Sequence, residues 1–300
     1  MTPSHPPGSP ATAGRETVGP AAVPVEALAV CEAAARAGGR VLLDWVGRFE
    51  VSHKGPRDLV TEADVASQRE IRRIVLDAFP GHGFVGEESL PDHATASRSA
   101  AGATDPEPRP TWIVDPLDGT SNYVHGFPAW CVSVALACGD DLLVGTIYDP
   151  VRDECFTAQA RAGARLNGRV IRVSGCARLA DALVALSFPP HITVDSTAVS
   201  DFLAVVPHVH SVRRTGSTAL NLAWLACGRL DAFWVRRIAS WDVAAGLLIL
   251  REAGGCLSGF EAAATIPAVI SLAEPAFIAG STPEIVAALR EALPSRPADR

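Results

Sequence analysis

A chain of 300 residues with 48% apolar residues is long and hydrophobic enough to bury a full core in one or two domains, which excludes a largely disordered protein. Its net charge of −7 excludes the basic surface by which proteins hold nucleic acid, so we expect no nucleic-acid partner. The chain has no apolar run of the ~20 residues that a membrane helix needs, and its N-terminus lacks the features of a secretory signal. For lack of such a run we expect no membrane partner. The seven cysteines form no C-x-x-C pair, so we expect reduced thiols in a cytoplasmic protein.

The chain begins with residues 1–24, which are rich in Pro, Ala, Gly and Ser and are expected to form a disordered tail. Apolar periodicity then predicts helices over 26–48 and 62–79. A short strand is expected at 84–85, followed by a surface loop over the Ala- and Pro-rich residues 90–110.

The middle of the chain is rich in predicted strands, at 130–138, 142–148, 154–159 and 170–173. Asn167-Gly168 suits a type I′ hairpin turn. The second half alternates strands at 183–186, 209–212, 232–235 and 276–279 with helices at 199–206, 217–227, 242–253 and 282–292. Gly228 is the expected C-cap of one helix, and Ser281 with Glu284 is the expected capping box of the last. This order predicts an α+β half followed by an α/β half.

The most informative segment is Asp115-Pro116-Leu117-Asp118-Gly119-Thr120. The apolar run before it is typical of a buried strand, and Pro116 and Gly119 favour a turn. Two carboxylates therefore lie beside exposed backbone N–H groups at the end of a strand. Carboxylates hold hard divalent cations, and the N–H groups that open a helix hold anions, so the segment indicates phosphate chemistry.

Three further segments carry acids: Asp58-Leu59-Val60-Thr61-Glu62-Ala63-Asp64, Gly86-Glu87-Glu88-Ser89 and Trp241-Asp242-Val243-Ala244-Ala245-Gly246. Each alone has a simpler explanation. Asp58 and Asp64 could flank and cap a helix, Glu87 could lie in a solvated turn, and Asp242 could be a helix N-cap.

Together the four segments, in this order, make the chain resemble the inositol monophosphatase family of metal-dependent, lithium-sensitive phosphatases. The resemblance covers roughly residues 26 to 292 and implies the layered αβαβα sandwich of the sugar phosphatases. It implies an N-terminal half, 25–175, with most of the metal ligands. A C-terminal half, 176–300, would carry Asp242 and the rim of the substrate site.

The resemblance also implies a set of ligands for two to three Mg²⁺ ions. The first ion would be held by Glu87, Asp115 and the Leu117 carbonyl, and the second by Asp115, Asp118 and Asp242. A third, weaker ion would lie on Glu87 and waters.

The expected catalytic residues are Asp58, Thr120 and Glu87. By the resemblance, Thr120 hydrogen-bonds to Asp58 and the pair orients and activates a metal-bound water. The backbone N–H groups of Gly119 and Thr120 would reach the phosphate, which requires the small Gly119. Asp115 and Asp118 are three residues apart, whereas the haloacid dehalogenase-type phosphatases use D-x-D, so attack by water is favoured over an aspartyl-phosphate.

The expected substrate rim departs from the family pattern. Inositol-specific members carry a Glu seven residues before the Asp of W-D-x-A, and that position is Val235 here, followed by Arg236 and Arg237. An arginine there suits a second anionic group on the substrate, although both arginines could simply be solvated. Ser217 and Thr218 correspond to another substrate-side segment of the family, which opens a helix and could donate hydroxyl and N–H groups to a polyol.

The sequence thus predicts a Mg²⁺-dependent phosphomonoesterase that hydrolyses a small cyclitol or sugar phosphate by metal-activated water. Alternatives are a phosphatase for another sugar phosphate or bisphosphate, for histidinol phosphate or for a nucleotide 3′-phosphate. A binding protein without catalysis is a further alternative. The resemblance implies a homodimer.

Overall fold

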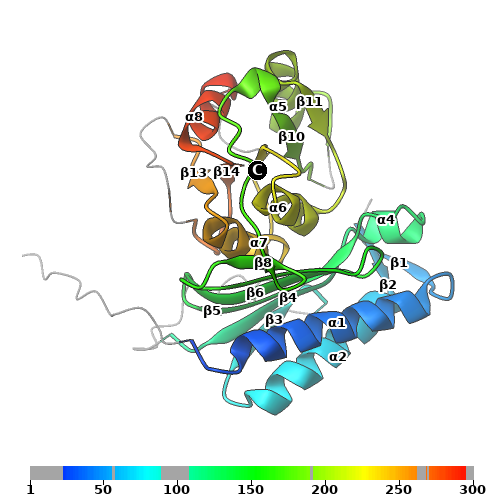
Figure 1. Ribbon diagram of the computed structural model, residues 1–300. Coiled ribbons are helices and arrows are strands. Elements are labelled where there is room, and N and C mark those ends of the chain that lie inside the picture. The colour runs from blue at the N-terminus through cyan, green and yellow to red at the C-terminus, as the bar shows by residue number, and fades with distance from the viewer. Residues whose placement is uncertain are drawn as a thin grey trace, which may run out of the picture.

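The computed structural model describes residues 23–55, 58–88, 108–189, 192–261, 268 and 270–294, with the backbone alone over 53–55 and 58–60. The expected tail up to residue 22 and the expected loop up to residue 107 lie outside the described residues. Five layers are stacked in Figure 1, helices alternating with two β-sheets. This is the αβαβα arrangement that the resemblance implied.

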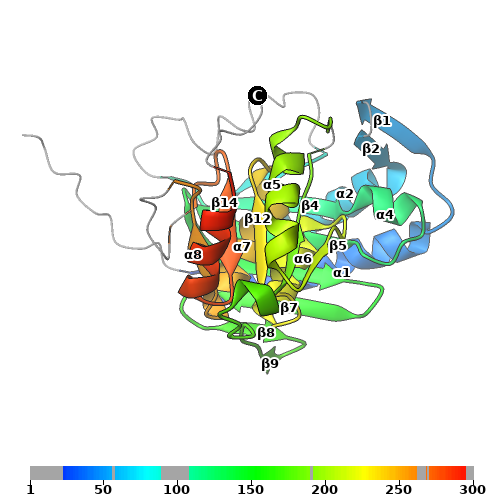
Figure 2. The same cartoon turned by 90° about the horizontal axis from the view of Figure 1, so that it is seen from above.

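The larger sheet has seven strands in chain order: β3 (Gly83–Gly86), β4 (Thr111–Asp118), β5 (Cys131–Cys138), β6 (Asp141–Asp149), β7 (Glu154–Gln159), β8 (Ala164–Leu166) and β9 (Arg169–Val170). The β3–β4 pair is parallel and every later pair is antiparallel. Its outer face is covered by α1 (Ala27–Trp45) and α2 (Glu62–Ala78). The β1–β2 hairpin, Val51–Gly55 and Asp58–Thr61, lies beside the short helix α4 (Thr120–Val124), as Figure 2 shows.

The smaller sheet has the order β11-β10-β12-β14-β13. Its strands are β10 (Leu183–Leu186), β11 (Ser211–Arg213), β12 (Ala232–Val235), β13 (Cys256–Ser258) and β14 (Phe277–Gly280). Strand β10 is parallel to both β11 and β12, so these three strands end at the same edge of the sheet. Ligand sites of α/β proteins lie at the carboxyl ends of parallel strands, which makes this edge a candidate for binding.

Two helices fill the layer between the sheets, α6 (Thr218–Ala226) and α7 (Ser240–Glu252). Helices α5 (Thr197–Val205) and α8 (Pro283–Ala292) cover the outer face of the smaller sheet. Two short 3₁₀ turns lie at Leu179–Asp181 and Val206–His208. None of the helices within the described ranges is long and apolar enough to cross a membrane.

Strand alternation divides the core as the period of two requires. On β5, Val132, Val134 and Leu136 pack towards α1 and α2, whereas Cys131, Ala135 and Ala137 join the layer that contains α6 and α7. On β12, Ala232 and Trp234 pack towards α8, and Phe233 and Val235 face the layer between the sheets. Both faces of each sheet are therefore buried at these central strands.

Most of the predicted helices and strands are confirmed, with bounds shifted by a few residues. Asn167 and Gly168 both have positive φ, 48° and 78°, as a type I′ turn requires. The predicted cap Ser281 is wrong. The Thr282 hydroxyl accepts from the Ile285 N–H and caps α8, while the Ser281 hydroxyl donates to the Cys176 carbonyl. The β1–β2 hairpin, α4, β8 and β13 are too short to leave a periodic pattern, and the prediction missed them.

Close approach between α7 and the larger sheet depends on Gly145 of β6. A Cβ built at this glycine would lie 3.0 Å from Ala245 Cα and 3.1 Å from its carbonyl oxygen. Since these are backbone atoms, a side chain here must push the helix away. We expect Gly145→Ala to lower the free energy of unfolding by about 1–3 kcal/mol, the usual effect of overpacking. Urea denaturation measures this, with Gly81→Ala as the control because nothing lies within 4 Å of that position. Equal stabilities of the two variants would contradict the packing described here.

Candidate metal centre

The end of β4 presents two carboxylates on the same side of the strand. Residues three apart on a regular strand face opposite sides. Here Asp115 pairs with Ser133 and Asp118 with Cys131, so three steps along β4 match two steps along β5. This one-residue bulge turns Asp118 to the side of Asp115, and Pro116 lies within it.

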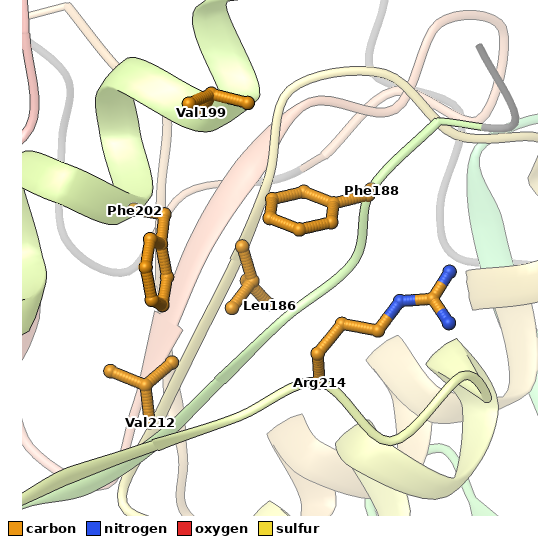
Figure 3. A pocket seen from close by; sticks show the side chains of 6 residues that line it. All are labelled: Leu186, Phe188, Val199, Phe202, Val212 and Arg214. Carbon is orange, nitrogen blue, oxygen red and sulfur yellow. The ribbon is translucent and has the colours of Figure 1, made fainter. Parts of the chain in front are cut away.

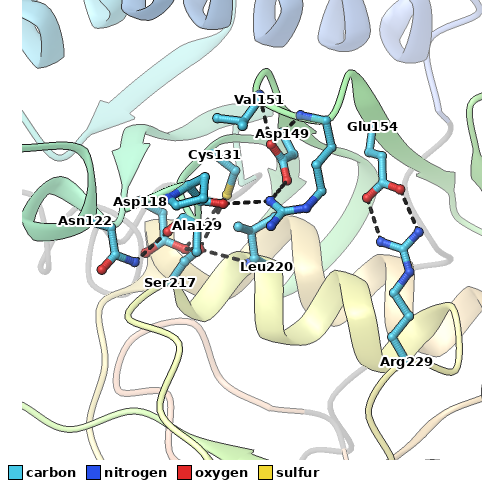
Figure 4. A network of polar contacts seen from close by, with 12 residues as sticks. Asp118, Asn122, Ala129, Cys131, Asp149, Val151, Glu154, Ser217, Leu220 and Arg229 are labelled. Carbon is cyan, nitrogen blue, oxygen red and sulfur yellow. Dashed lines mark hydrogen bonds and ion pairs between the residues drawn. The ribbon is translucent and has the colours of Figure 1, made fainter. Parts of the chain in front are cut away.

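Asp118 is held by the start of α6. Its Oδ2 accepts from the Ser217 hydroxyl at 2.5 Å and from the Ala219 N–H at 2.7 Å, and the Cys131 thiol lies 3.9 Å away. The Ser217 hydroxyl also accepts from the Leu220 N–H at 3.2 Å, so Ser217 is the N-cap of α6 (Figure 4). The same interactions that cap α6 therefore fix the orientation of one acid.

Asp242 enters from the first turn of α7, where its Oδ2 accepts from the Ala239 N–H at 3.2 Å. Carboxylate oxygens of Asp115, Asp118 and Asp242 all lie within 4.8 Å of one another. Glu87 follows β3, the parallel neighbour of β4; its N–H donates to the Val114 carbonyl at 3.1 Å, and its carboxyl hydrogen-bonds with Asp115. The structure thus brings together four of the predicted acids from distant parts of the sequence.

Burial and mutual repulsion dominate the electrostatics of this acid cluster: Glu87, Asp115, Asp118 and Asp242. Burial, with repulsion from Glu87 and Asp118, raises the pKa of both Asp115 and Asp242 well above the usual range. Burial also raises the pKa of Asp118, to about 6, although the Ser217 hydroxyl opposes that rise. A divalent cation among these oxygens would relieve the repulsion.

Thr120 lies one residue beyond Gly119, which is in the left-handed region at φ 96°. A Cβ on Gly119 would come within 2.9 Å of the Ala129 carbonyl oxygen, so a glycine is required here. The Thr120 hydroxyl is 3.1 Å from the Leu117 carbonyl and 3.4 Å from Asp64 Oδ1. Asp64 Oδ2 accepts from the Thr61 N–H at 2.9 Å.

The acid beside Thr120 is therefore Asp64, whereas the sequence prediction named Asp58. The Asp58 side chain lies outside the described residues, so its pairing with Thr120 stays a prediction. The signal in the sequence that favoured Asp64 was its position as N3 of a helix, facing back to the Thr61 cap. In the sequence alone, helix capping is the simpler explanation of that position.

Two residues predicted to contact a substrate are buried. The Ser217 hydroxyl donates to Asp118 and is fully buried, so that hydroxyl positions an acid and is not free for a substrate. Thr218 is also buried and its hydroxyl lies 2.7 Å from the Ser187 hydroxyl. Of this pair, the half-buried Ser187 has the more accessible side chain.

Val235 and Arg236 are wrong as residues of an open substrate rim. Val235 is 2% exposed because strand alternation directs it into the layer between the sheets. Arg236, directed to the opposite side, forms a paired contact with Asp201, at 2.6 Å and 2.9 Å, and donates to the Pro294 carbonyl. Its guanidinium lies 4.2 Å from the centroid of the Phe260 ring. Arg237 is exposed.

A sequence model of the inositol monophosphatase family matches residues 24–295. Inositol monophosphatase 2 of Solanum lycopersicum is 44% identical over 75% of this chain and 83% of its own length. The inositol-1-monophosphatase of Mesorhizobium japonicum is 39% identical over 77% of this chain and 84% of its own length. The crystal structure of the extragenic suppressor protein suhB from Bartonella henselae superposes with a TM-score of 0.78 at 36% identity, covering 90% of this chain and 98% of that one.

The chain belongs to the inositol monophosphatase family. The residues matched by the family model include the whole acid cluster and Asp64. The expected family ligands Glu87, Asp115, Asp118 and Asp242 meet at one place in this member of the inositol monophosphatase family.

In this inositol monophosphatase family member, the Arg236–Asp201 pair is expected to stabilise the fold. Their side chains are 9% and 1% exposed. Arg236→Met leaves the Asp201 charge buried without its partner, so we expect the free energy of unfolding to fall by about 3–5 kcal/mol. Adding Asp201→Leu should restore most of that loss. Chemical denaturation measures both, and Arg237→Met on the exposed neighbour is the control, expected within about 0.5 kcal/mol of wild type. A null effect of Arg236→Met would refute the structural role.

The acid cluster predicts an unusual pH dependence of stability in metal-free protein. The folded-state pKa of Asp118, about 6, exceeds its ordinary value of 3.8. Its stabilising contribution is therefore present below pH 4 and is lost as the pH rises through about 6, a loss of up to about 3 kcal/mol. Asp115 and Asp242 shift in the same direction.

We therefore expect the melting temperature in chelator to fall between pH 5 and pH 7.5, and Mg²⁺ to restore it at pH 7.5. Asp118→Asn should show a weaker pH dependence, which controls for the remaining titratable groups. A melting temperature in chelator that rises with pH over this interval would contradict the electrostatics of the acid cluster.

Proposed function

We propose that this protein is a Mg²⁺-dependent phosphomonoesterase that hydrolyses a small phosphorylated cyclitol or sugar. Membership of the family makes it a phosphoric monoester hydrolase. The observation that carries the proposal is the convergence of four carboxylates from β3, β4 and α7 in one buried acid cluster. Such a cluster is too costly to keep for stability alone, which favours a catalytic protein over an idle relative.

The donor set fits Mg²⁺. It consists of carboxylate oxygens, to which the family resemblance adds the Leu117 carbonyl, and hard divalent cations prefer such oxygen ligands. Burial keeps the one nearby thiol, Cys131, protonated because its pKa is raised well above the usual range. Glu87, Asp115, Asp118, Asp242 and the Leu117 carbonyl would hold the two or three ions. When bound, Mg²⁺ supplies charge neutralisation at the phosphoryl group and activates the attacking water.

The protein's own groups would complete the reaction geometry. The N–H groups of Gly119 and Thr120 open α4 and would bind a phosphoryl oxygen. With its hydroxyl proton directed to Asp64 Oδ1, Thr120 would present a lone pair to the attacking water. Asp64 then accepts the proton that the water gives up through Thr120. Asp64 is held for this role by the Thr61 N–H on its other oxygen.

Inositol monophosphate is the first substrate to test, because the related proteins of Solanum lycopersicum and Mesorhizobium japonicum carry that activity in their names. Lithium inhibition and a homodimer complete the proposal and rest on the family resemblance; a cytoplasmic location rests on the reduced cysteines expected from the sequence.

Asp115→Asn should abolish phosphate release, because Asp115 is central to the acid cluster and would bridge two ions. We expect a loss of at least ~10³-fold in kcat on inositol 1-phosphate with Mg²⁺. Chelator should stop the wild type, and millimolar lithium should inhibit it. Glu88→Gln, on the neighbouring residue, is the matched control and should stay within a few-fold. Turnover of Asp115→Asn within tenfold of wild type would refute the metal assignment.

A second pair of variants distinguishes Asp64 from Asp58. We expect Asp64→Asn to lower kcat by about 10²–10⁴-fold, the usual contribution of a general base, and Asp58→Asn to stay within tenfold. Thr61→Val controls for loss of the helix cap, since it removes a contact of Asp64 and leaves Thr120 in place. If Asp58→Asn is the inactive variant and Asp64→Asn is active, the base assignment is reversed.

A further inference from the structure

The buried face of α2 changes character along the helix. Its second half is apolar and contributes Ile71 and Val75 to the core, whereas its first half contributes the polar side chains of Asp64, Ser67 and Gln68. These three residues, at positions i, i+3 and i+4, form one polar stripe and are 0%, 0% and 8% exposed. Burying a polar group costs free energy unless it finds a hydrogen-bond partner, so the partners of this stripe indicate its role.

Gln68 holds the turn that carries Glu87. Its Oε1 accepts from the Glu88 N–H at 2.9 Å, and this N–H belongs to the peptide group that follows Glu87. The N–H of Glu87 itself donates to the Val114 carbonyl at 3.1 Å, so Glu87 is held on both sides of its Cα atom. A Cβ at Gly86 would lie 2.6 Å from Gln68 Cδ, so the amide can approach this turn because residue 86 has no side chain.

Ser67 holds the bulge of β4 in a similar way. Its hydroxyl donates to the Pro116 carbonyl at 3.1 Å, and the bulge leaves Pro116 outside the pairing register with β5. The N–H of the same peptide group, that of Leu117, donates to Asp115 Oδ1 at 2.9 Å. Ser67 therefore orients a peptide group that itself holds one oxygen of Asp115.

Both contacts of α2 lead to the ligands expected for the first ion. Those ligands include Glu87 and Asp115, and the carboxyl groups of the two residues are hydrogen-bonded to each other. Asp118, expected to bind the second ion, is held by Ser217 and Ala219 at the start of α6 instead. The two expected ions thus depend on different helices.

We propose that Ser67 and Gln68 are positioning residues of the metal centre. They fix the peptide groups beside Asp115 and Glu87, and so hold the two carboxylates where one cation can bind both. The inference rests on the proposed function and gives a role in it to residues that are not ligands themselves. Loss of such outer contacts typically costs about 10–100-fold in metal affinity or activity.

Calorimetric titration of Mg²⁺ into the chelator-treated full chain, without substrate, tests this role. Gln68→Met keeps a similar side-chain volume and removes the acceptor, so we expect about tenfold weaker binding. Gln68→Glu keeps an acceptor and adds a charge that attracts the cation, so it should bind Mg²⁺ at least as tightly as the wild type. Ser67→Ala should weaken binding about tenfold.

Three control variants separate positioning from a general loss of stability. Ile71→Val removes a methylene group from the apolar half of α2. Phe202→Leu shrinks a side chain of the apolar pocket under α5, on the outer face of the smaller sheet (Figure 3). Both should lower the melting temperature and leave the Mg²⁺ affinity unchanged. Arg69→Met, on the exposed neighbour of Gln68, should change neither quantity.

Hydrolysis of inositol 1-phosphate gives a second readout, at a temperature where every variant is folded by thermal melting. Gln68→Met should need about tenfold more Mg²⁺ for half-maximal activity and keep most of its kcat at saturating Mg²⁺. A Mg²⁺ affinity unchanged in Gln68→Met or in Ser67→Ala would overturn the role of that residue. An affinity that falls equally in Ile71→Val would overturn both roles. The expected Mg²⁺ affinities in a protein that hydrolyses no phosphomonoester would support the inference and refute the proposed function.

Discussion

Four acidic side chains meet where β4 ends and α6 and α7 begin, and their repulsion in a buried setting is the constraint on which the site depends. Without a bound cation, four buried carboxylates this close together would take up protons or move apart. The fold prevents separation by fixing each acid with a different element. A β-bulge turns Asp118 towards Asp115, the first turn of α6 holds Asp118, and the first turn of α7 holds Asp242. A divalent cation bound to these oxygens would relieve the repulsion, so the same electrostatics that destabilise the metal-free protein would favour metal binding.

Much of this could be predicted from the sequence. Asp115, Asp118 and Glu87 come shortly after apolar runs and beside turn residues, a local pattern that predicts carboxylates at the end of a strand. Asp242 lies far along the chain, and only the resemblance to a family linked it to the others. The αβαβα layering also came from the resemblance, because hydrophobic periodicity predicts individual helices and strands but not the order in which their layers stack.

The failures share one physical cause, which is that a side chain's surroundings depend on contacts distant in sequence. Arg236 is followed by a second arginine and was expected at a solvent rim, yet it meets Asp201 thirty-five residues away. Val235 alternates into the core because β12 has buried layers on both of its faces, a property of the assembled sheet. In the sequence, capping of a helix suffices to explain Asp64; its second oxygen reaches Thr120 because α2 packs beside β4, the strand that leads to Thr120. The division into halves near residue 175 stays a prediction.

The central claim is that the acid cluster is a Mg²⁺ site whose protons are displaced by the metal. Calorimetric titration of Mg²⁺ into chelator-treated protein at pH 6.5, in two buffers of different ionisation enthalpy, tests it most directly. The account predicts saturable binding, with heats that differ between the buffers because protons leave Asp115 and Asp242, whose pKa values are raised. Asp242→Asn should weaken the binding. Absence of saturable binding by the wild type, or unchanged binding by Asp242→Asn, would contradict the account.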